Sequence, residues 1–364
     1  MKKMMCILAT AIAALVLTGC GGKPKIPANT VVACYVDLEK CLKNGNDIAE
    51  LVIDNLPKHL KGKAEDAHEK AREEFEKNLS SFDFKWLAVT VGTDGKGTEE
   101  IAAVVRCDYL EKNESGKNLP QLIEDYGGVK RASKFDTDVI NVYLPVFGMA
   151  SIAFVDEDYI ILTKNEDWLE KMVRLYADGK GDTSDAFDDL TDLGSDTVAR
   201  IQTADAKTLV DLAGVRDNLE SFGEQCDDAD FIEDLLDIGN ITLDITVSDD
   251  VLGCELTVEA GSKELAKAVE GFFNIVALCN HIGADAVAAF STYGKLLPLA
   301  ASRELDAFGK LLKEETLYEL AAMIRDSVEV DRSGSTVKAS CTYDTEDLVE
   351  LLVPPFAEIA DKAL

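Results

Sequence analysis

Paired runs of alternating apolar residues, each pair joined by a short polar turn, limit the fold of this chain more than any other feature. One such pair covers 240–247 and 251–260 and turns at Ser248-Asp249-Asp250. A side-chain period of two on either side of turn residues predicts a β-hairpin. Long stretches with apolar residues every three or four positions, as at 263–281, predict amphipathic helices. We therefore predict an α+β fold, with antiparallel sheets built from hairpins and long amphipathic helices on one face.

The predicted elements follow a similar order in two halves of the chain. We expect strands at 30–38, 85–92, 99–109, 139–144, 149–155, 159–163, 197–203, 240–247, 251–260, 326–332 and 335–342. We expect helices at 46–57, 63–79, 120–126, 166–177, 205–221, 229–237, 263–281 and from Asp344 onward. Both halves read strand, two helices, hairpin, helix, hairpin, helix, which predicts an internal duplication. The predicted organisation is a first α+β unit at 30–178, an acidic connection at 179–196, and a second unit at 197–364 with a helical insertion near 284–325.

The N-terminal residues have the pattern of an export signal that ends in a cysteine. Two lysines precede an apolar stretch, Cys6–Leu17, which is too short to span a bilayer. The stretch runs into Leu17-Thr18-Gly19-Cys20, which resembles the lipobox of bacterial lipoproteins at all four positions. That resemblance implies a signal peptide at 1–19 and acyl chains on the sulfur and the amine of Cys20. Several chains together anchor a protein stably where one is marginal.

A stretch with Gly and Pro follows the cysteine and predicts a flexible tether at 20–29. In the best-known sorting systems, an Asp directly after the cysteine retains a lipoprotein at the inner membrane. Gly21 occupies that position here and favours the outer membrane. We therefore expect an exported, lipid-anchored protein whose body lies in the periplasm or at the cell surface.

The acidic balance of the chain limits its partners. The formal net charge is −31, and removal of the two lysines of the signal peptide leaves −33 on the mature body. Such a surface repels nucleic acid and anionic lipid headgroups, so we expect no nucleic-acid partner. The hydrophobic fraction of 47% is normal for a globular protein, so the acidity belongs to the surface of a folded body.

Four segments resemble a group of uncharacterised bacterial lipoproteins of unknown function. They are VVACYVDLEKCLK, FKWLAVTVG, IAAVVRCDY and SIAFVDEDYIILTKNEDWLEKMV. The segments are strand and hairpin patterns and contain no catalytic motif, so the resemblance transfers no functional residue. It implies a duplicated α+β body and favours a protein that is not an enzyme.

Seven cysteines remain beyond the anchor. Because seven is odd, at least one stays free or pairs with another molecule, and the sequence leaves the pairing open. Four of them lie within alternating strand patterns and are predicted to be small buried apolar side chains: Cys34, Cys107, Cys254 and Cys341.

Signatures of the common catalytic classes are missing from the sequence. It contains no G-x-S-x-G, no H-E-x-x-H and no P-loop pattern. The histidines are His59, His68 and His281, and Cys279-x-His281 has no second ligand pair at zinc spacing. A Cys–His nucleophilic pair stays open, because such partners meet only in the fold. We assign no catalytic, cofactor-binding or metal-binding residue, and the one assigned site is lipid attachment at Cys20.

Two runs of aspartate, within 182–192 and 227–230, offer the hard oxygen donors that calcium prefers. Neither run has the order of an EF-hand loop, so we favour helix caps and solvated loops. Trp86 and Trp168 are candidates to line a sugar site. Each lies on an apolar stripe or strand, however, which favours core packing.

These features predict a membrane-anchored cell-envelope lipoprotein, not an enzyme, that acts as a binding or structural module. The expected partners are the lipid bilayer, through acylated Cys20, and envelope proteins, with no cofactor. One alternative is a ligand-binding lipoprotein for a small molecule, a glycan or Ca²⁺, which requires a deep pocket. A second alternative is an envelope hydrolase, which requires a convergent acid–base or nucleophilic site.

Overall fold

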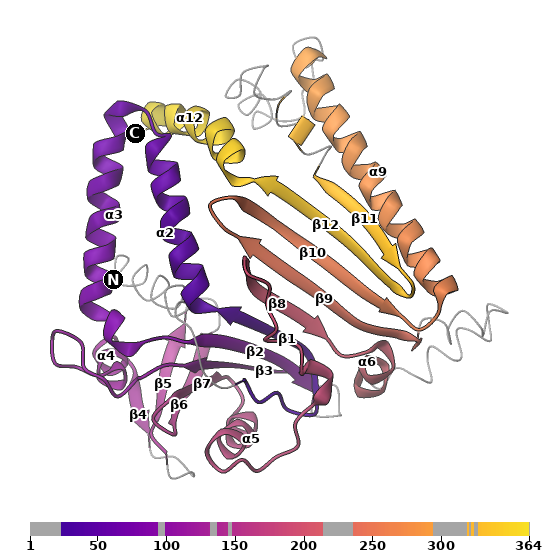
Figure 1. The fold of residues 1–364 in the computed structure, drawn as a ribbon. Helices are drawn as coiled ribbons and strands as arrows, with labels where there is room; N and C mark the ends of the chain where they lie inside the picture. Colours follow the sequence, from indigo (N-terminus) through magenta and orange to yellow (C-terminus); the bar gives the residue numbers. More distant parts are fainter. Residues whose placement is uncertain are drawn as a thin grey trace. The chain divides into compact units, whose positions relative to one another are not determined.

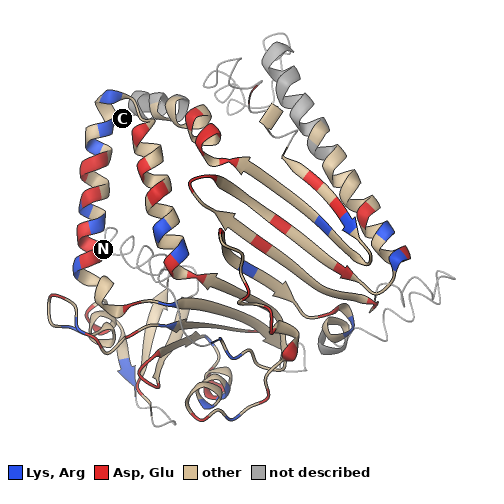
Figure 2. Ribbon diagram, viewed as in Figure 1, with Lys and Arg blue, Asp and Glu red and all other residues tan. Residues whose placement is uncertain are grey.

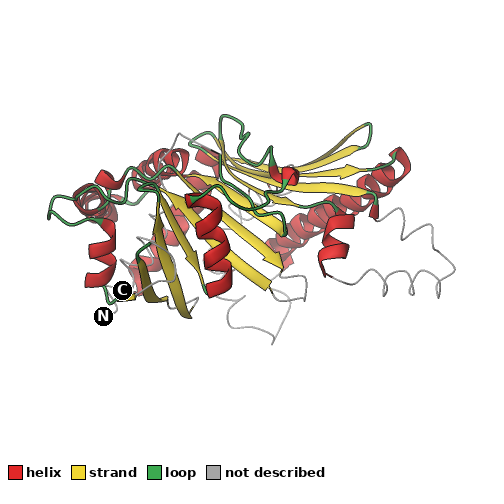
Figure 3. Cartoon of the chain, turned by 90° about the horizontal axis from the view of Figure 1, so that it is seen from below, coloured by secondary structure: helices red, strands yellow, loops and turns green. Residues whose placement is uncertain are grey.

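A computed structural model describes residues 23–93, 99–131, 137–144, 148–213, 236–293, 319, 322–323 and 327–363. These residues form helices and antiparallel strands joined by loops (Figure 3). The strands form a twelve-stranded sheet in the order β11-β12-β10-β9-β8-β1-β2-β3-β7-β6-β5-β4 (Figure 1). The predicted α+β class, with an antiparallel sheet built from hairpins, is confirmed.

The chain divides into two compact units. Unit 1 comprises Met1–Lys43 and Ala71–Asp244, and unit 2 comprises Asn44–Lys70 and Ile245–Leu364. Helices α2 (Leu38–Asp54) and α3 (Lys58–Asn78) each contribute to both units.

Among the described residues, unit 1 contains nine strands and three short helices. The strands are β1 (Thr30–Asp37), β2 (Trp86–Thr93), β3 (Glu99–Arg106), β4 (Val129–Arg131), β5 (Val139–Leu144), β6 (Gly148–Val155), β7 (Tyr159–Thr163), β8 (Thr197–Thr203) and most of β9 (Ile238–Val247). The helices are α4 (Leu119–Asp125), α5 (Glu166–Ala177) and α6 (Ala206–Ala213), with 3₁₀ turns at Ser80–Phe82 and Asp185–Phe187.

Two hydrophobic clusters cover opposite faces of the unit 1 sheet. Consecutive residues of a strand point to opposite faces. In β5, Val139 belongs to the cluster that contains Trp168 of α5, whereas Ile140 belongs to the cluster that contains Leu119 of α4. Helices therefore lie on both faces of this unit. The arrangement differs from the one-sided cover that we expected, because both strand faces carry large apolar residues that need burial.

The boundaries of the units also differ from the predicted ones. Strand β8, predicted to open the second unit, pairs with β1 in unit 1. Phe187 and Leu190 of the predicted acidic connection are buried in a cluster with Ile26 and Ala33. Pairing and burial thus assign 179–204 to unit 1, although the acidic composition of 179–196 resembles that of a linker.

Unit 2 contains a three-stranded antiparallel arrangement with a long helix against it. Its elements are β10 (Val251–Ala260), β11 (Val328–Ser333), β12 (Thr336–Asp344), α9 (Lys263–Tyr293) and α12 (Thr345–Ala363). Strand β12 pairs with both β10 and β11. Helix α9 contacts all three strands and buries Leu265, Ala266 and Phe273.

The bounds of several predicted helices differ in the structure: α2 begins at Leu38 and α3 at Lys58, before the starts expected at 46 and 63. Helix α9 continues to Tyr293, beyond the end expected at residue 281. Helix α6 is described as far as Ala213, and most of the expected helices at 205–221, 229–237 and 284–325 lies outside the described residues. Among the helices that the structure describes, none has the length and apolar character needed to cross a membrane.

Candidate functional site

Cys20, the predicted lipid-attachment residue, lies outside the described residues, but the segment that follows it makes defined contacts. The amide of Ala28 donates to the carbonyl of Asp182 at 2.9 Å, and Ser184 donates to Ile26 at 2.9 Å. Ile26 is 4% exposed. This segment belongs to the range that we expected to be a flexible tether. Backbone pairing and one buried isoleucine instead attach it to unit 1 a few residues after Cys20.

Tyr176 of α5 holds the same segment through its phenol. The amide of Lys25 donates to the Tyr176 hydroxyl at 3.0 Å, and the hydroxyl donates to the Lys25 carbonyl at 3.2 Å. Burial raises the pKa of Tyr176 far above its usual value, so the phenol stays protonated and serves as donor and acceptor at once. These contacts hold the segment around Lys25 against α5 of unit 1.

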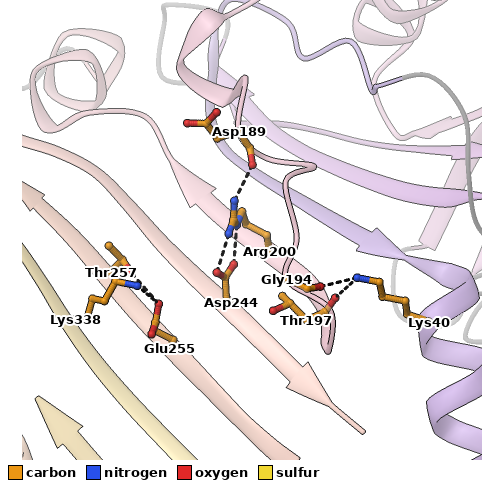
Figure 4. A network of polar contacts seen from close by, with 9 residues as sticks. All are labelled: Lys40, Asp189, Gly194, Thr197, Arg200, Asp244, Glu255, Thr257 and Lys338. Atoms are coloured by element: carbon orange, nitrogen blue, oxygen red, sulfur yellow. Dashed lines mark hydrogen bonds and ion pairs between the residues drawn. The ribbon is translucent and has the colours of Figure 1, made fainter. Parts of the chain in front are cut away.

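A charged network links β8, β9 and the 185–197 segment of unit 1 (Figure 4). Arg200 donates from Nε to Oδ1 of Asp244 at 2.6 Å and from Nη2 to Oδ2 at 2.8 Å, with both side chains less than 20% exposed. Its Nη1 donates to the carbonyl of Asp189 at 2.7 Å. Every guanidinium nitrogen of Arg200 therefore has a partner. Such a bidentate pair orders the sheet, and three of the five N–H donors of the guanidinium are used within unit 1.

Lys40 of α2 makes a second contact with this region. Its Nζ donates to the carbonyl of Gly194 at 2.6 Å and to that of Thr197 at 3.3 Å (Figure 4). The amide of Lys40 donates to Oδ1 of Asp37 at 3.1 Å, which caps the start of α2. Both contacts have a structural role within unit 1.

Five cysteines are free thiols that differ in exposure: Cys34, Cys41, Cys107, Cys254 and Cys341. Cys107 is fully buried, and burial raises its pKa well above the usual value, with Asp108 adding to the effect. Burial also raises the pKa of Cys34 and of Cys41 to about 11, and Asp37 contributes at Cys41. These three thiols stay protonated near neutrality and are poor nucleophiles.

Cys254 does not follow the prediction of a buried apolar side chain. It is exposed, while its register partner Cys341 is half-buried. Helix α9 contacts β10, but burial on this strand is confined to Val258 and Ala260 near its end. The alternating pattern identified the strand correctly, whereas the extent of helix cover determines which of its residues are buried.

In the candidate calcium-binding run 182–192, several main-chain carbonyls are engaged in the fold, and Oδ1 of Asp192 lies 3.5 Å from Nζ of Lys23. The carbonyl of Asp182 accepts from Ala28, that of Asp188 from Lys23, and that of Asp189 from Arg200. Within the part of the chain that the structure describes, no group of three or more Asp, Glu, His or Cys side chains is arranged to hold a metal ion. The 227–230 run lies outside the described residues.

The remaining candidate residues are placed as follows. Trp86 and Trp168 are buried at 1% and 0% exposure in one cluster, which confirms core packing. His59 on α3 and His281 on α9 are exposed, and His68 is half-buried. Acidic and basic residues alternate along α3, which buries no side chain (Figure 2). The histidines lie at separate places on two helices and form no common site.

Two groups of exposed large apolar side chains are relevant to binding. Helix α9 exposes Phe272 and Ile275, each at 60%, close to two further apolar residues, Val276 and Leu278. In unit 1, Tyr143 of β5 is 65% exposed beside its register partner Met149. Exposed apolar residues of this size mark interaction surfaces more often than isolated surface residues do.

Comparison with known proteins gives little further information. No protein-family model matches the chain, and no curated protein matches it. Among solved structures, crystal form III of TP0453 has a TM-score of 0.39 and 7% sequence identity, and covers 92% of this chain and 98% of its own. Crystal form I of TP0453 has a TM-score of 0.37 and 8% identity, with 92% and 97% covered. At these TM-scores the likeness does not establish a common fold.

Proposed function

We propose that this chain is an exported bacterial lipoprotein held on a membrane by acyl chains on Cys20, and that its acidic body is a non-catalytic binding or structural module. The observation that carries the proposal is the order of two lysines, the apolar stretch Cys6–Leu17 and Leu17-Thr18-Gly19-Cys20. Gly21 favours the outer membrane as the site of the anchor.

Envelope proteins are the partners that this body suits best. A mature charge of −33 disfavours nucleic acid and anionic headgroups and favours basic protein surfaces. The exposed apolar residues of α9 supply the kind of side chain that forms the centre of a protein interface. The charged network of Arg200 and the buried thiols have structural roles within the unit that contains them. These structural roles support a module that acts by binding other proteins.

Site-specific photo-crosslinking in intact envelopes tests this function. A benzophenone amino acid at Phe272 samples the apolar residues of α9, and the same probe at exposed Lys267 on the same helix is the matched control. We expect a discrete protein adduct from position 272 and a weaker or different one from position 267. Lack of any protein adduct above background at position 272 would count against partner binding through α9.

The internal duplication remains a proposal, based on the order of elements in the two halves. Ligand binding and hydrolysis remain alternatives. A thermal-shift screen of the chain against cations, sugars, amino acids and peptidoglycan fragments separates them from partner binding. A ligand at a hundredfold excess over its dissociation constant stabilises the folded state by about 2.7 kcal/mol. A clear shift with one chemical class would favour the ligand-binding alternative.

A further inference from the structure

Two free cysteines face each other across neighbouring strands of unit 2. Cys254 of β10 and Cys341 of β12 are direct register partners in an antiparallel pair whose register is continuous from Val251 to Glu259. Residues directly opposite each other in such a pair project their side chains to the same face. The two thiols are therefore neighbours although they lie far apart in the sequence.

The backbone hydrogen bonds define the geometry of this pair. Thr345 donates to Asp250 at 3.1 Å, and Ala260 donates to Ser335 at 2.9 Å. In an antiparallel ladder, hydrogen-bonded pairs recur at every second position. The pairs Asp250–Thr345 and Ala260–Ser335 each lie an even number of positions from Cys254–Cys341, so the two cysteines also form a hydrogen-bonded pair. The Cα atoms of such a pair lie about 5.5 Å apart, within the range of about 4.4–6.8 Å that a disulfide spans. The Cβ atoms lie up to about 5.5 Å apart and must approach each other to reach the roughly 3.5–4.5 Å of a disulfide, and the resulting strain makes the bond easier to reduce.

Two further observations agree with neighbouring side chains at these two positions. Gly253 precedes Cys254, and a Cβ at Gly253 would lie 2.5 Å from the carbonyl oxygen of Cys341 and 3.0 Å from Cα of Thr342. The strands thus approach closely beside the thiols. Burial raises the pKa of Cys254, and the charge of Cys341 raises it further, as expected for neighbouring sulfurs.

The environment of the pair allows an exchange partner to reach it. Cys254 is exposed, whereas Cys341 is half-buried with its Sγ 3.5 Å from the Ser327 hydroxyl and 3.4 Å from that of Tyr343. The contrast with Cys34 is direct, because the register partners of Cys34 are Val89 and Ile201. Among the residues that the structure describes, only Cys254 and Cys341 pair thiol with thiol across a sheet.

We propose that Cys254 and Cys341 form a reversible cross-strand disulfide by exchange with a low-molecular-weight or protein disulfide. The thiolate of exposed Cys254 attacks the incoming disulfide RSSR, which forms a mixed disulfide and releases RS⁻. The thiolate of Cys341 then attacks Sγ of Cys254 and releases the second RS⁻. The two released thiolates take up the two protons that the cysteines lose. Two protein thiols are thereby oxidised by two electrons, and one disulfide is reduced to two thiols.

The new bond would close the chain between β10 and β12 into a covalent loop that includes α9. Cross-links that close long loops constrain the unfolded chain, so oxidation stabilises unit 2 against unfolding. Formation of the disulfide in the cell rests on the proposed export. The geometry of the cysteine pair is independent of that proposal.

Oxidised glutathione and the purified full-length chain in detergent test the inference. After incubation, free thiols are alkylated under denaturing conditions and linked peptides are identified by mass spectrometry. We expect a Cys254–Cys341 link in the wild type and in the control C34S. We expect C341S to accumulate a glutathione adduct at Cys254, because it lacks the resolving thiol. The wild-type readout requires no variant, so misfolding of C341S would not obscure the result.

A stable glutathione adduct on Cys254 of the wild type without the Cys254–Cys341 link would overturn the inference. So would a link that joins either residue to a different cysteine instead. A Cys254–Cys341 link in the purified chain, together with reduced thiols after acid trapping in cells, would support the inference and count against the proposed export.

Discussion

The bidentate pair between Arg200 and Asp244 allows a quantitative test of how unit 1 is stabilised. We expect Asp244→Ala to lower the free energy of unfolding by about 2–3 kcal/mol, because the guanidinium loses two charge-assisted bonds in a partly buried site. Breaking a fully buried pair costs about 3–5 kcal/mol, and breaking an exposed pair costs about 0–1 kcal/mol. The exposures of 15% and 18% place this pair between the two limits.

A double-mutant cycle isolates the interaction from other effects of the substitutions. Arg200→Ala also removes the bond to the Asp189 carbonyl, which Asp244→Ala leaves in place. We expect the double variant to be more stable than the sum of the single effects predicts, with a coupling energy of about 1–2 kcal/mol. Lys117→Ala is the control, because Lys117 and Asp125 form an exposed pair at 47% and 51%. Its expected cost is below about 1 kcal/mol.

Urea unfolding followed by tryptophan fluorescence suits this cycle. Trp86 and Trp168 are both buried in unit 1, so their emission reports the unit that contains the pair. A coupling energy near zero, or a cost for Asp244→Ala equal to that of Lys117→Ala, would refute the argument that partial burial strengthens this pair.

Three further predictions concern the backbone, a helix cap and a buried thiol. Gly253→Ala should destabilise unit 2, because the added Cβ would meet backbone atoms of β12. The Cβ added by Gly271→Ala in α9 meets nothing within 4 Å, so this variant should be more stable by up to about 1 kcal/mol. Thermal melts by circular dichroism compare the two variants. Burial acts to raise the pKa of Asp205, but hydrogen bonds from Thr208 outweigh it and lower the pKa. Asp205 therefore contributes stability above its unfolded pKa of about 3.9 that is lost as the pH falls through the lower folded pKa. Asp205→Ala should cost about 1 kcal/mol at pH about 7 and less at low pH, measured by urea titration, and equal costs at both would contradict this. Cys107 should react with a maleimide only after urea unfolding, and labelling in the native protein would contradict its burial.

The sequence predicted elements best where turn chemistry is explicit. Asn165 caps α5 by accepting hydrogen bonds from Asp167 and Trp168, and the predicted bounds of that helix match the structure. Strand β8 also matches. The start of α2 was expected at Asn46, because Asn is a favoured residue at a helix N-terminus. The cap from Asp37 and the burial of Leu38 begin the helix earlier.

Long-range pairing explains what the sequence did not predict. Hairpins such as β11–β12 follow from a turn, but the β10–β12 pairing joins strands separated by α9 and has no local signal. Cys254 and Cys341 lie opposite each other only because of that register. The alternating sequence pattern carries no such information and predicted two separate buried apolar side chains. The predicted unit boundaries differ from the structure for a similar reason. The 179–196 segment resembles a linker by composition, but two buried residues, Phe187 and Leu190, hold it against unit 1.

Acylation of Cys20 is the central claim of this account, and metabolic labelling tests it most directly. Cells that express the wild type, C20S or the control C34S are grown with an alkyne fatty acid, and the chain is isolated and its N-terminal peptide analysed by mass spectrometry. The account predicts an acylated peptide that begins at Cys20 in the wild type and in C34S. It predicts an unlabelled, uncleaved chain for C20S. Equal labelling of C20S, or an unacylated wild-type chain that begins at another residue, would contradict the account.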